Sequence, residues 1–146
     1  MTGHSGELPT LLVSACLLGV RCNHEGGHSR RSAVEALAAT HRLIPICPEV
    51  CGGLSTPRPA AERVGDRVVN ADGDDVTHAY DRGAQVAVEL AHAVGAERAV
   101  LKARSPSCGS AAVYDGTFSR TLRAGEGVAA AALRGAGIEV VSEEEI

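Results

Sequence analysis

Short apolar runs alternate with amphipathic stretches along most of this chain. Four runs have the length and composition of buried strands: 10–15, 43–47, 99–102 and 138–142. Three stretches between or after them have helical spacing of apolar residues or an alanine-rich composition: 29–40, 74–94 and 127–134. This alternation predicts a mostly parallel, Rossmann-like sheet of about four strands, flanked by helices, in a single α/β domain over residues 10–146.

Local signals set the expected limits of these elements. Pro45 lies within the second apolar run and favours an edge position for that strand. The helix over 74–94 is expected to begin at an aspartate and to end at Gly95. The glycines and prolines from Pro48 onward predict irregular structure as far as a hairpin over 63–70. We expect residues 1–9 to form a flexible leader and 143–145 a solvated tail.

Composition and charge exclude several classes of protein. The formal net charge is −4, which does not suit a general nucleic-acid binder. Aromatic residues make up only 2% of the chain, so we expect no base-stacking surface built on rings. No apolar run approaches the roughly 18 residues of a membrane span, and no signal peptide precedes the domain. These features predict a cytoplasmic protein without membrane contact.

Five cysteines are the strongest chemical signal, and their odd number argues against a disulfide framework. Cys16, Cys47 and Cys108 each lie at or just beyond the end of a predicted strand. Because parallel strands end at one edge of their sheet, these thiols are expected to meet there, at the site of the ligand. Three thiolates suit either a zinc ion with an open position or a 4Fe-4S cluster with one iron free of protein ligands.

Other polar residues fall in the same predicted loops. Glu49 lies two residues beyond Cys47 and is a candidate general base. Ser105 and Ser107 offer hydroxyl groups close to Cys108. Arg58 can pair with a carboxylate or orient a substrate, and Lys102 ends the third predicted strand facing the same region.

Seven segments of the chain carry recognisable motifs. They are Ser14-Ala15-Cys16-Leu17-Leu18-Gly19, Cys47-Pro48-Glu49-Val50, Gly52-Gly53-Leu54, Thr56-Pro57-Arg58, Lys102-Ala103-Arg104-Ser105-Pro106-Ser107-Cys108-Gly109, Tyr114-Asp115-Gly116-Thr117-Phe118 and Gly125-Glu126-Gly127-Val128. Together these segments resemble a bacterial family long labelled a domain of unknown function, which includes iron–sulfur thiouracil desulfurases. The similarity spans about Leu11 to Ser142, and many relatives have an Arg-Tyr-Asp-Gly-like segment where this chain has Asn23-His24-Glu25-Gly26.

The resemblance implies an oxygen-sensitive 4Fe-4S cluster held by Cys16, Cys47 and Cys108, with catalytic roles for Glu49 and Ser105. The implied reaction replaces the sulfur of a thiolated pyrimidine such as 4-thiouracil, as base or nucleoside, by oxygen. An iron with an open coordination position would act as a Lewis acid and sulfide would be released.

The resemblance also implies loading by the iron–sulfur assembly machinery. Arg58, Ser107 and Lys102 are then expected to bind substrate, and Cys22 and Cys51 not to be ligands. Two other functions remain open: a non-catalytic iron–sulfur sensor or carrier, and a zinc-dependent hydrolase that uses the same three cysteines.

Overall fold

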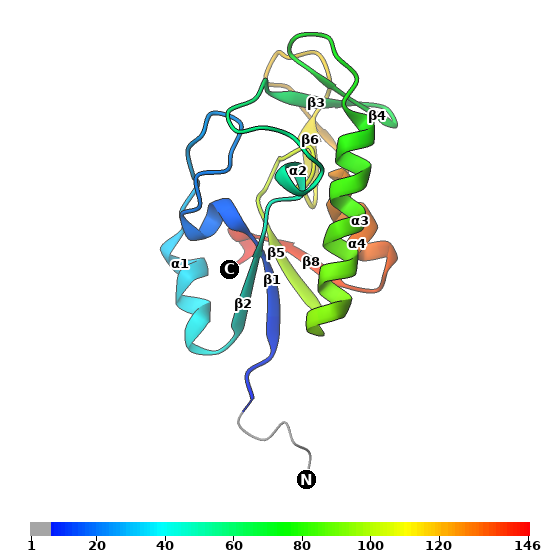
Figure 1. The fold of residues 1–146 in the computed structure, drawn as a ribbon. Coiled ribbons are helices and arrows are strands. Elements are labelled where there is room, and N and C mark those ends of the chain that lie inside the picture. The colour runs from blue at the N-terminus through cyan, green and yellow to red at the C-terminus, as the bar shows by residue number, and fades with distance from the viewer. Residues whose placement is uncertain (1–6) are drawn as a thin grey trace.

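A parallel sheet of four strands forms the centre of the molecule, for which the computed structural model describes residues 7–146 (Figure 1). The strand order is β2–β1–β5–β8, and β2 is an edge strand, as Pro45 predicted. The four predicted strands are confirmed to within one residue at each end. Their bounds are Thr10–Ser14 for β1, Arg42–Ile46 for β2, Arg98–Leu101 for β5 and Glu139–Ser142 for β8.

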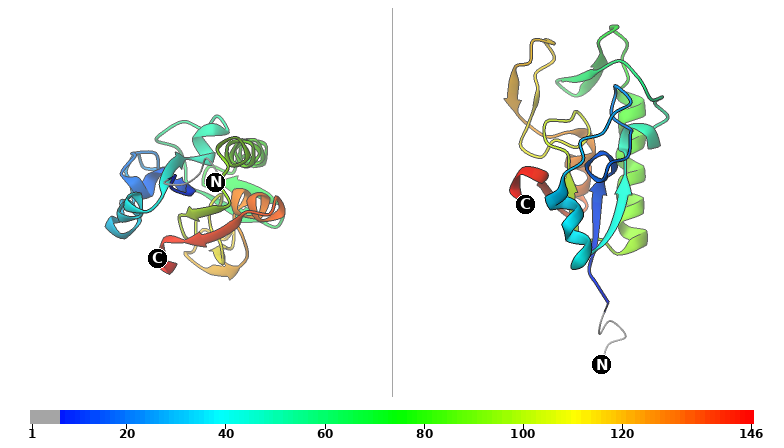
Figure 2. Two further views of the ribbon diagram at one scale, coloured as in Figure 1. Left: turned by 90° about the horizontal axis from the view of Figure 1, so that it is seen from below. Right: turned by 90° about the vertical axis from the view of Figure 1, so that its left-hand side faces the viewer.

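Helices cover both faces of the sheet (Figures 1 and 2). The helices α3, Thr77–Val94, and α4, Val128–Gly135, pack on one face, where Leu12 of β1 joins their alanines and leucines in one buried cluster. The 3-10 turn η1, Ala15–Leu18, and the helix α1, Ser32–Glu35, lie on the other face. Leu11 and Val13 pack there, because successive strand residues point to opposite faces.

Two helices begin later than the sequence predicts, because backbone hydrogen bonds tie their expected first residues to other segments. The stretch 29–40 contains only α1 and the 3-10 turn η2, Ala36–Ala39. Its first residues instead bond to η1, with the amide of Ser29 donating to Cys16 and that of Arg31 to Leu17. The helix α3 begins three residues after position 74, since the amide of Val76 donates to β4. Gly95 ends α3 with φ +69°, as predicted.

Four small elements lie above the carboxyl ends of the strands (Figure 1). The hairpin of β3, Ala61–Val64, and β4, Arg67–Asn70, confirms the prediction and starts two residues earlier. A second hairpin, β6 Ala112–Tyr114 with β7 Leu122–Ala124, was not predicted, because its strands have only three residues each and show no clear alternation.

The helix α2, Pro48–Cys51, corrects the expectation of irregular structure from Pro48 onward. Proline is compatible with the first position of a helix because that position needs no amide donor. The turn is also packed tightly on α3. A Cβ atom at Gly52 would lie 1.9 Å from the carbonyl oxygen of Ala79, and one at Gly83 would lie 1.9 Å from that of Pro48. Both glycines are therefore needed for this close helix contact.

The predicted solvated tail is wrong for Glu143, which is a second correction, whereas Glu144 and Glu145 are exposed as predicted. Glu143–Glu145 form the 3-10 turn η3, and Glu143 is only 2% exposed. Its carboxylate accepts a hydrogen bond from the amide of Ala103 at 2.7 Å and lies 3.3 Å from Nζ of Lys102. The predicted leader falls mostly on residues 1–6, which lie outside the described part of the chain. No helix in the described part is long and apolar enough to cross a membrane.

Candidate active site

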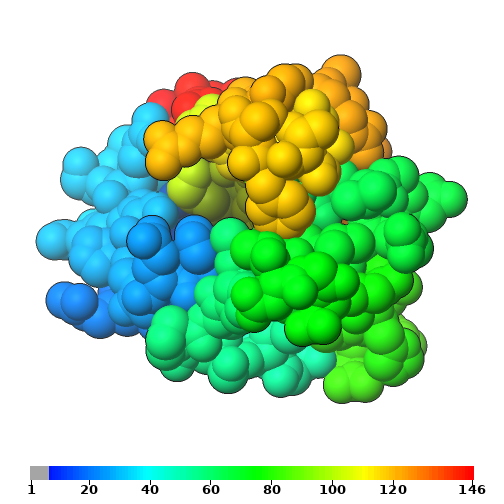
Figure 3. Space-filling model, turned by 90° about the horizontal axis from the view of Figure 1, so that it is seen from above, coloured from blue at the N-terminus to red at the C-terminus, as the bar shows by residue number. Residues whose placement is uncertain are grey.

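A cavity of about 650 Å³ opens above the carboxyl ends of β1, β2 and β5. The space-filling view from above shows it as a hollow, with the segment after β5 at its floor and the β6–β7 hairpin along one side (Figure 3). Its lining comes from the loops that follow all three strands and from both small hairpins. This is the edge at which ligands bind in open α/β sheets.

Three cysteines from three different loops line this cavity. Cys16 lies in η1 just beyond β1, Cys47 between β2 and α2, and Cys108 in the loop after β5. Burial is the main cause that raises the pKa of the Cys16 thiol to about 11 and that of Cys108 to about 12. The neighbouring Cys47 raises the pKa of Cys16 further, whereas Lys102 lowers it.

The other two cysteines differ from each other in position. Cys22 is buried and lines the same cavity, and its carbonyl oxygen accepts a hydrogen bond from the Cys47 thiol at 3.7 Å. Burial and the adjacent Cys47 raise the pKa of Cys22 to about 12. Cys51 is exposed on α2 and is not part of the cavity lining.

The donor set fits an iron–sulfur cluster better than a single metal ion. Within residues 7–146, no group of three His, Cys, Asp or Glu is arranged to hold one ion. The thiolates of a cluster bind different irons, so they need not converge on one point. Cys16, Cys47 and Cys108 surround a shared cavity and meet this looser requirement. Loading would release their protons, because thiolates are the ligating form.

Glu49 is held at the cavity wall by donors from three separate elements. Its Oε1 accepts a hydrogen bond from Nε of Arg58 at 3.0 Å and from the hydroxyl of Tyr80 at 2.8 Å. Its Oε2 accepts one from the hydroxyl of Ser107 at 3.0 Å. The side chain is 13% exposed, and it is the acceptor in all three hydrogen bonds.

Arg58 shows the first of its two expected roles, the pairing with a carboxylate. Its guanidinium is 5% exposed and also donates to the carbonyl oxygens of Cys22 and Ser55. It also donates to the hydroxyl of Thr56, within the segment that contains the cis Thr56–Pro57 peptide bond. Arg58 therefore connects the loop after α2 to both Glu49 and the loop of Cys22.

Tyr80 is a site residue that the sequence reasoning missed. The helical spacing of the stretch 74–94 places it on the apolar face of that helix, and it is indeed only 2% exposed. A buried tyrosine hydroxyl usually has a hydrogen-bond partner, so a tyrosine on the apolar face of a helix indicates a polar group packed against that face. Burial and the adjacent Glu49 raise the pKa of Tyr80 well above its usual range.

The two serines occupy different positions in the loop before Cys108. Ser105 Oγ accepts hydrogen bonds from the amides of Ser107 and Cys108, each at 3.1 Å, and so shapes the loop. Ser107 is 2% exposed, and its hydroxyl lies between Ser105 Oγ, at 3.0 Å, and the carboxylate of Glu49. Ser107, rather than Ser105, contacts the candidate base directly.

Lys102 lines the cavity from the end of β5. Its amide donates to Ser14 Oγ at 2.9 Å, which ties β5 to β1. Its ammonium group donates to the carbonyl of Ala103 and pairs with the buried Glu143, yet 28% of the side chain stays exposed. The charge can therefore still reach a bound ligand.

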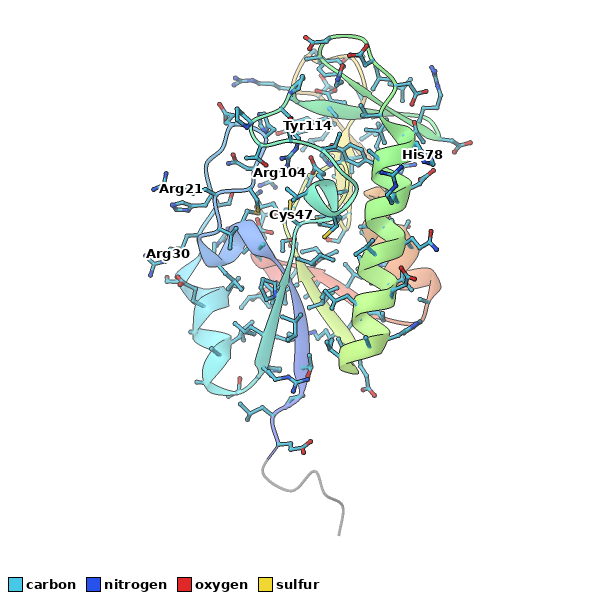
Figure 4. The ribbon with its side chains drawn as sticks, viewed as in Figure 1. Arg21, Arg30, Cys47, His78, Arg104 and Tyr114 are labelled. Carbon is cyan, nitrogen blue, oxygen red and sulfur yellow. The ribbon has the colours of Figure 1, made fainter. Side chains whose placement is uncertain are left out.

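The rim of the cavity contains three residues with left-handed backbone: Arg104, Phe118 and Arg120. Figure 4 shows Arg104, Tyr114 and Cys47 within the region between the sheet edge and the hairpins. Arg21, Arg30 and His78 lie on the outside of the molecule. They do not belong to the cavity lining.

The chain is similar to known proteins over nearly its whole length. Residues 11–145 match the family described as 2-thiouracil desulfurase. An uncharacterized protein of Bacillus subtilis (strain 168), YbbK, is 40% identical over 146 residues, which cover 93% of this chain and 97% of that protein. A solved structure of the [4Fe-4S]-dependent thiouracil desulfidase TudS matches with a TM-score of 0.89 and 46% identity, over 94% of this chain and 93% of that one.

Proposed function

This chain belongs to the 2-thiouracil desulfurase family, an enzyme family, as its motifs predicted, and we propose that it converts a thiolated pyrimidine such as 4-thiouracil to the oxo form. The oxygen comes from water and the sulfur leaves as sulfide, so no net electron transfer is needed. The observation that carries the proposal is the meeting of three thiols, Glu49 and the two serines around one cavity.

Cys16, Cys47 and Cys108 are the residues that would hold the 4Fe-4S cluster. With only three protein ligands, the cluster would supply a Lewis-acidic iron for the thiocarbonyl sulfur of the substrate. Cys22 faces the same cavity but would close that position if it were a fourth ligand. An oxygen-sensitive cluster and free thiols suit the cytoplasm, where iron–sulfur assembly proteins would load the site.

Glu49 acts as the general base. Its Oε1 already accepts two hydrogen bonds, from Arg58 and Tyr80, whereas Oε2 accepts one, from Ser107. A carboxylate oxygen has two lone-pair positions, so Oε2 retains one for a water molecule. Oε2 takes a proton from this water as its oxygen attacks the carbon that bears sulfur.

The serines provide a path for that proton. Ser107 has a single hydroxyl proton and donates it to Glu49, so the 3.0 Å contact between the serines has Ser105 as its donor. Before the reaction, Ser105 thus donates to Ser107, and Ser107 donates to Glu49. Once Glu49 is protonated, both hydrogen bonds reverse: Glu49 gives its proton to Ser107, and Ser107 gives its own to Ser105. Ser105 then gives its proton to the departing sulfur.

The substrate is held by groups at the cavity wall. Lys102 keeps part of its side chain open to the cavity and binds the polar edge of the base. Ser107 orients the substrate through its position beside Glu49. Arg58 contributes indirectly, because its hydrogen bonds fix the carboxylate that must face the substrate.

The test is anaerobic purification followed by assays of iron, acid-labile sulfide, and conversion of 4-thiouracil to uracil. We expect about four irons and four sulfides per chain, and turnover that Glu49→Ala abolishes without loss of the cluster. Glu89→Gln, on the exposed face of α3, is the matched control and should keep full turnover. A cluster without turnover would instead favour a sensor or carrier, and zinc without iron a hydrolase.

A further inference from the structure

The three aromatic residues of this chain all line the same cavity. The sequence contains two tyrosines, one phenylalanine and no tryptophan. Tyr80, Tyr114 and Phe118 come from α3, β6 and the β6–β7 turn, and each belongs to the cavity lining. The low aromatic content suggested that no ring surface exists. The fold instead gathers every ring at one site.

The three rings differ in how far they are open to the cavity. Tyr80 is 2% exposed and its hydroxyl is bonded to Glu49, and Tyr114 is half-buried. Phe118 is 41% exposed and is the most exposed of the three rings. The remaining apolar lining consists of alanines, prolines and Ile46, none of which offers a flat surface of this size.

The backbone holds Phe118 in a defined place at the rim. We define the rim arm as residues 115–121, between β6 and β7. One carboxylate oxygen of Glu62, on β3, accepts hydrogen bonds from the amides of Gly116 and Phe118, at 3.0 and 3.1 Å. Phe118 itself has φ +56°, a conformation that side chains other than glycine and asparagine rarely adopt. Such backbone conformations gather at ligand-binding sites.

We propose that Phe118 is a specificity-determining residue whose ring stacks on the face of the substrate pyrimidine. This inference rests on the proposed function and extends it. The polar groups around Glu49 and Ser107 suit the edge of the base, where its sulfur and nitrogens lie. Its two faces need an apolar partner, and stacking on a phenyl ring provides one. Glu62 is a positioning residue, because it holds the arm that presents the ring.

The test compares ring-removing and ring-keeping variants in cluster-loaded protein under anaerobic conditions. Phe118→Asn removes the ring with a residue that tolerates the left-handed backbone, and Phe118→Tyr keeps the ring. Leu122→Ala is the matched control, since Leu122 is 45% exposed on the same hairpin but outside the cavity lining. Uracil, the oxo product, is the binding probe in equilibrium dialysis, and 4-thiouracil is the substrate for KM and kcat.

We expect Phe118→Asn to raise both the Kd for uracil and the KM for 4-thiouracil about 10-fold, as loss of a base–aromatic stack does. Iron content and kcat should stay at the wild-type level. Leu122→Ala should leave all four quantities unchanged, and Phe118→Tyr, which keeps the ring, should raise the Kd and the KM far less than Phe118→Asn does. A fall in kcat at constant KM, or an equal effect of Leu122→Ala, would overturn the inference.

Failure of the proposed function gives a different result. A wild-type protein that binds uracil but does not convert 4-thiouracil removes the desulfurase proposal, and the uracil Kd of Phe118→Asn then decides the role of the ring alone. An unchanged Kd in that variant rejects stacking. A wild-type protein that neither binds uracil nor converts 4-thiouracil rejects both proposals.

Discussion

Replacement of Arg58 by methionine tests whether the pair it forms with Glu49 holds the site together. Both partners are nearly buried, at 5% and 13% exposure, and Nε of Arg58 lies 3.0 Å from Oε1 of Glu49. Loss of one partner of a buried ion pair lowers the free energy of unfolding by roughly 3–5 kcal/mol, because the other charge stays uncompensated. Tyr80 and Ser107 still donate to the carboxylate, so we expect the lower end, about 3 kcal/mol.

A double-mutant cycle separates this charge effect from the loss of packing. Glu49→Gln removes the charge and keeps an oxygen that can accept the bond of Tyr80. In the double variant, Arg58→Met should therefore cost about 1 kcal/mol, which makes the coupling energy about 2 kcal/mol.

Thermal or urea unfolding, followed by circular dichroism with all variants in the same cluster state, measures both quantities. For a protein of this size, a loss of about 3 kcal/mol corresponds to a fall in Tm of roughly 6–12 °C. A coupling energy near zero, or a loss of under about 1 kcal/mol in Arg58→Met, would refute the argument.

Two further predictions follow, one from the close contact between α2 and α3 and one from the positions of the cysteines. Gly83→Ala should lower Tm although alanine favours helices, because its Cβ would meet the carbonyl oxygen of Pro48. Gly135→Ala, in open space at the end of α4, is the control in the same unfolding assay, and an equal loss there would contradict this reason. Cys51→Ser should keep the iron and sulfide content of the wild-type protein, whereas Cys47→Ser should lose it. Loss of the cluster in Cys51→Ser would show that Cys51 is a cluster ligand although it is exposed and lies outside the cavity lining.

Elements with a strong local signal were predictable without the structure. The four strands are continuous apolar runs of a length that fits a buried parallel sheet, and their order with the helices leaves few topologies. Gly95 ends α3 because glycine adopts positive φ without strain. The placement of Cys16, Cys47 and Cys108 around one cavity follows from the same topology, since parallel strands end at one edge.

Contacts between distant segments had no such signal. Nothing local in the sequence of α3 indicates that Tyr80 donates to Glu49, 31 positions away. The helix α2 is too short to show periodicity and depends on its contact with Gly83. Glu143 belongs to a run of acidic residues typical of a solvated end, and it is buried only because Ala103 and Lys102 offer it partners.

The sequence by itself therefore determined the sheet, its crossover helices and the strand ends at which the thiols lie, because apolar period and strand length are local properties. The tertiary structure decided which polar side chains meet. Glu49 acquires its three donors only when segments from separate parts of the chain pack against one another. The same is true of the hydrogen bonds by which Glu62 holds the rim arm. Hydrogen bonds between such loops depend on side-chain positions that no spacing along the chain encodes.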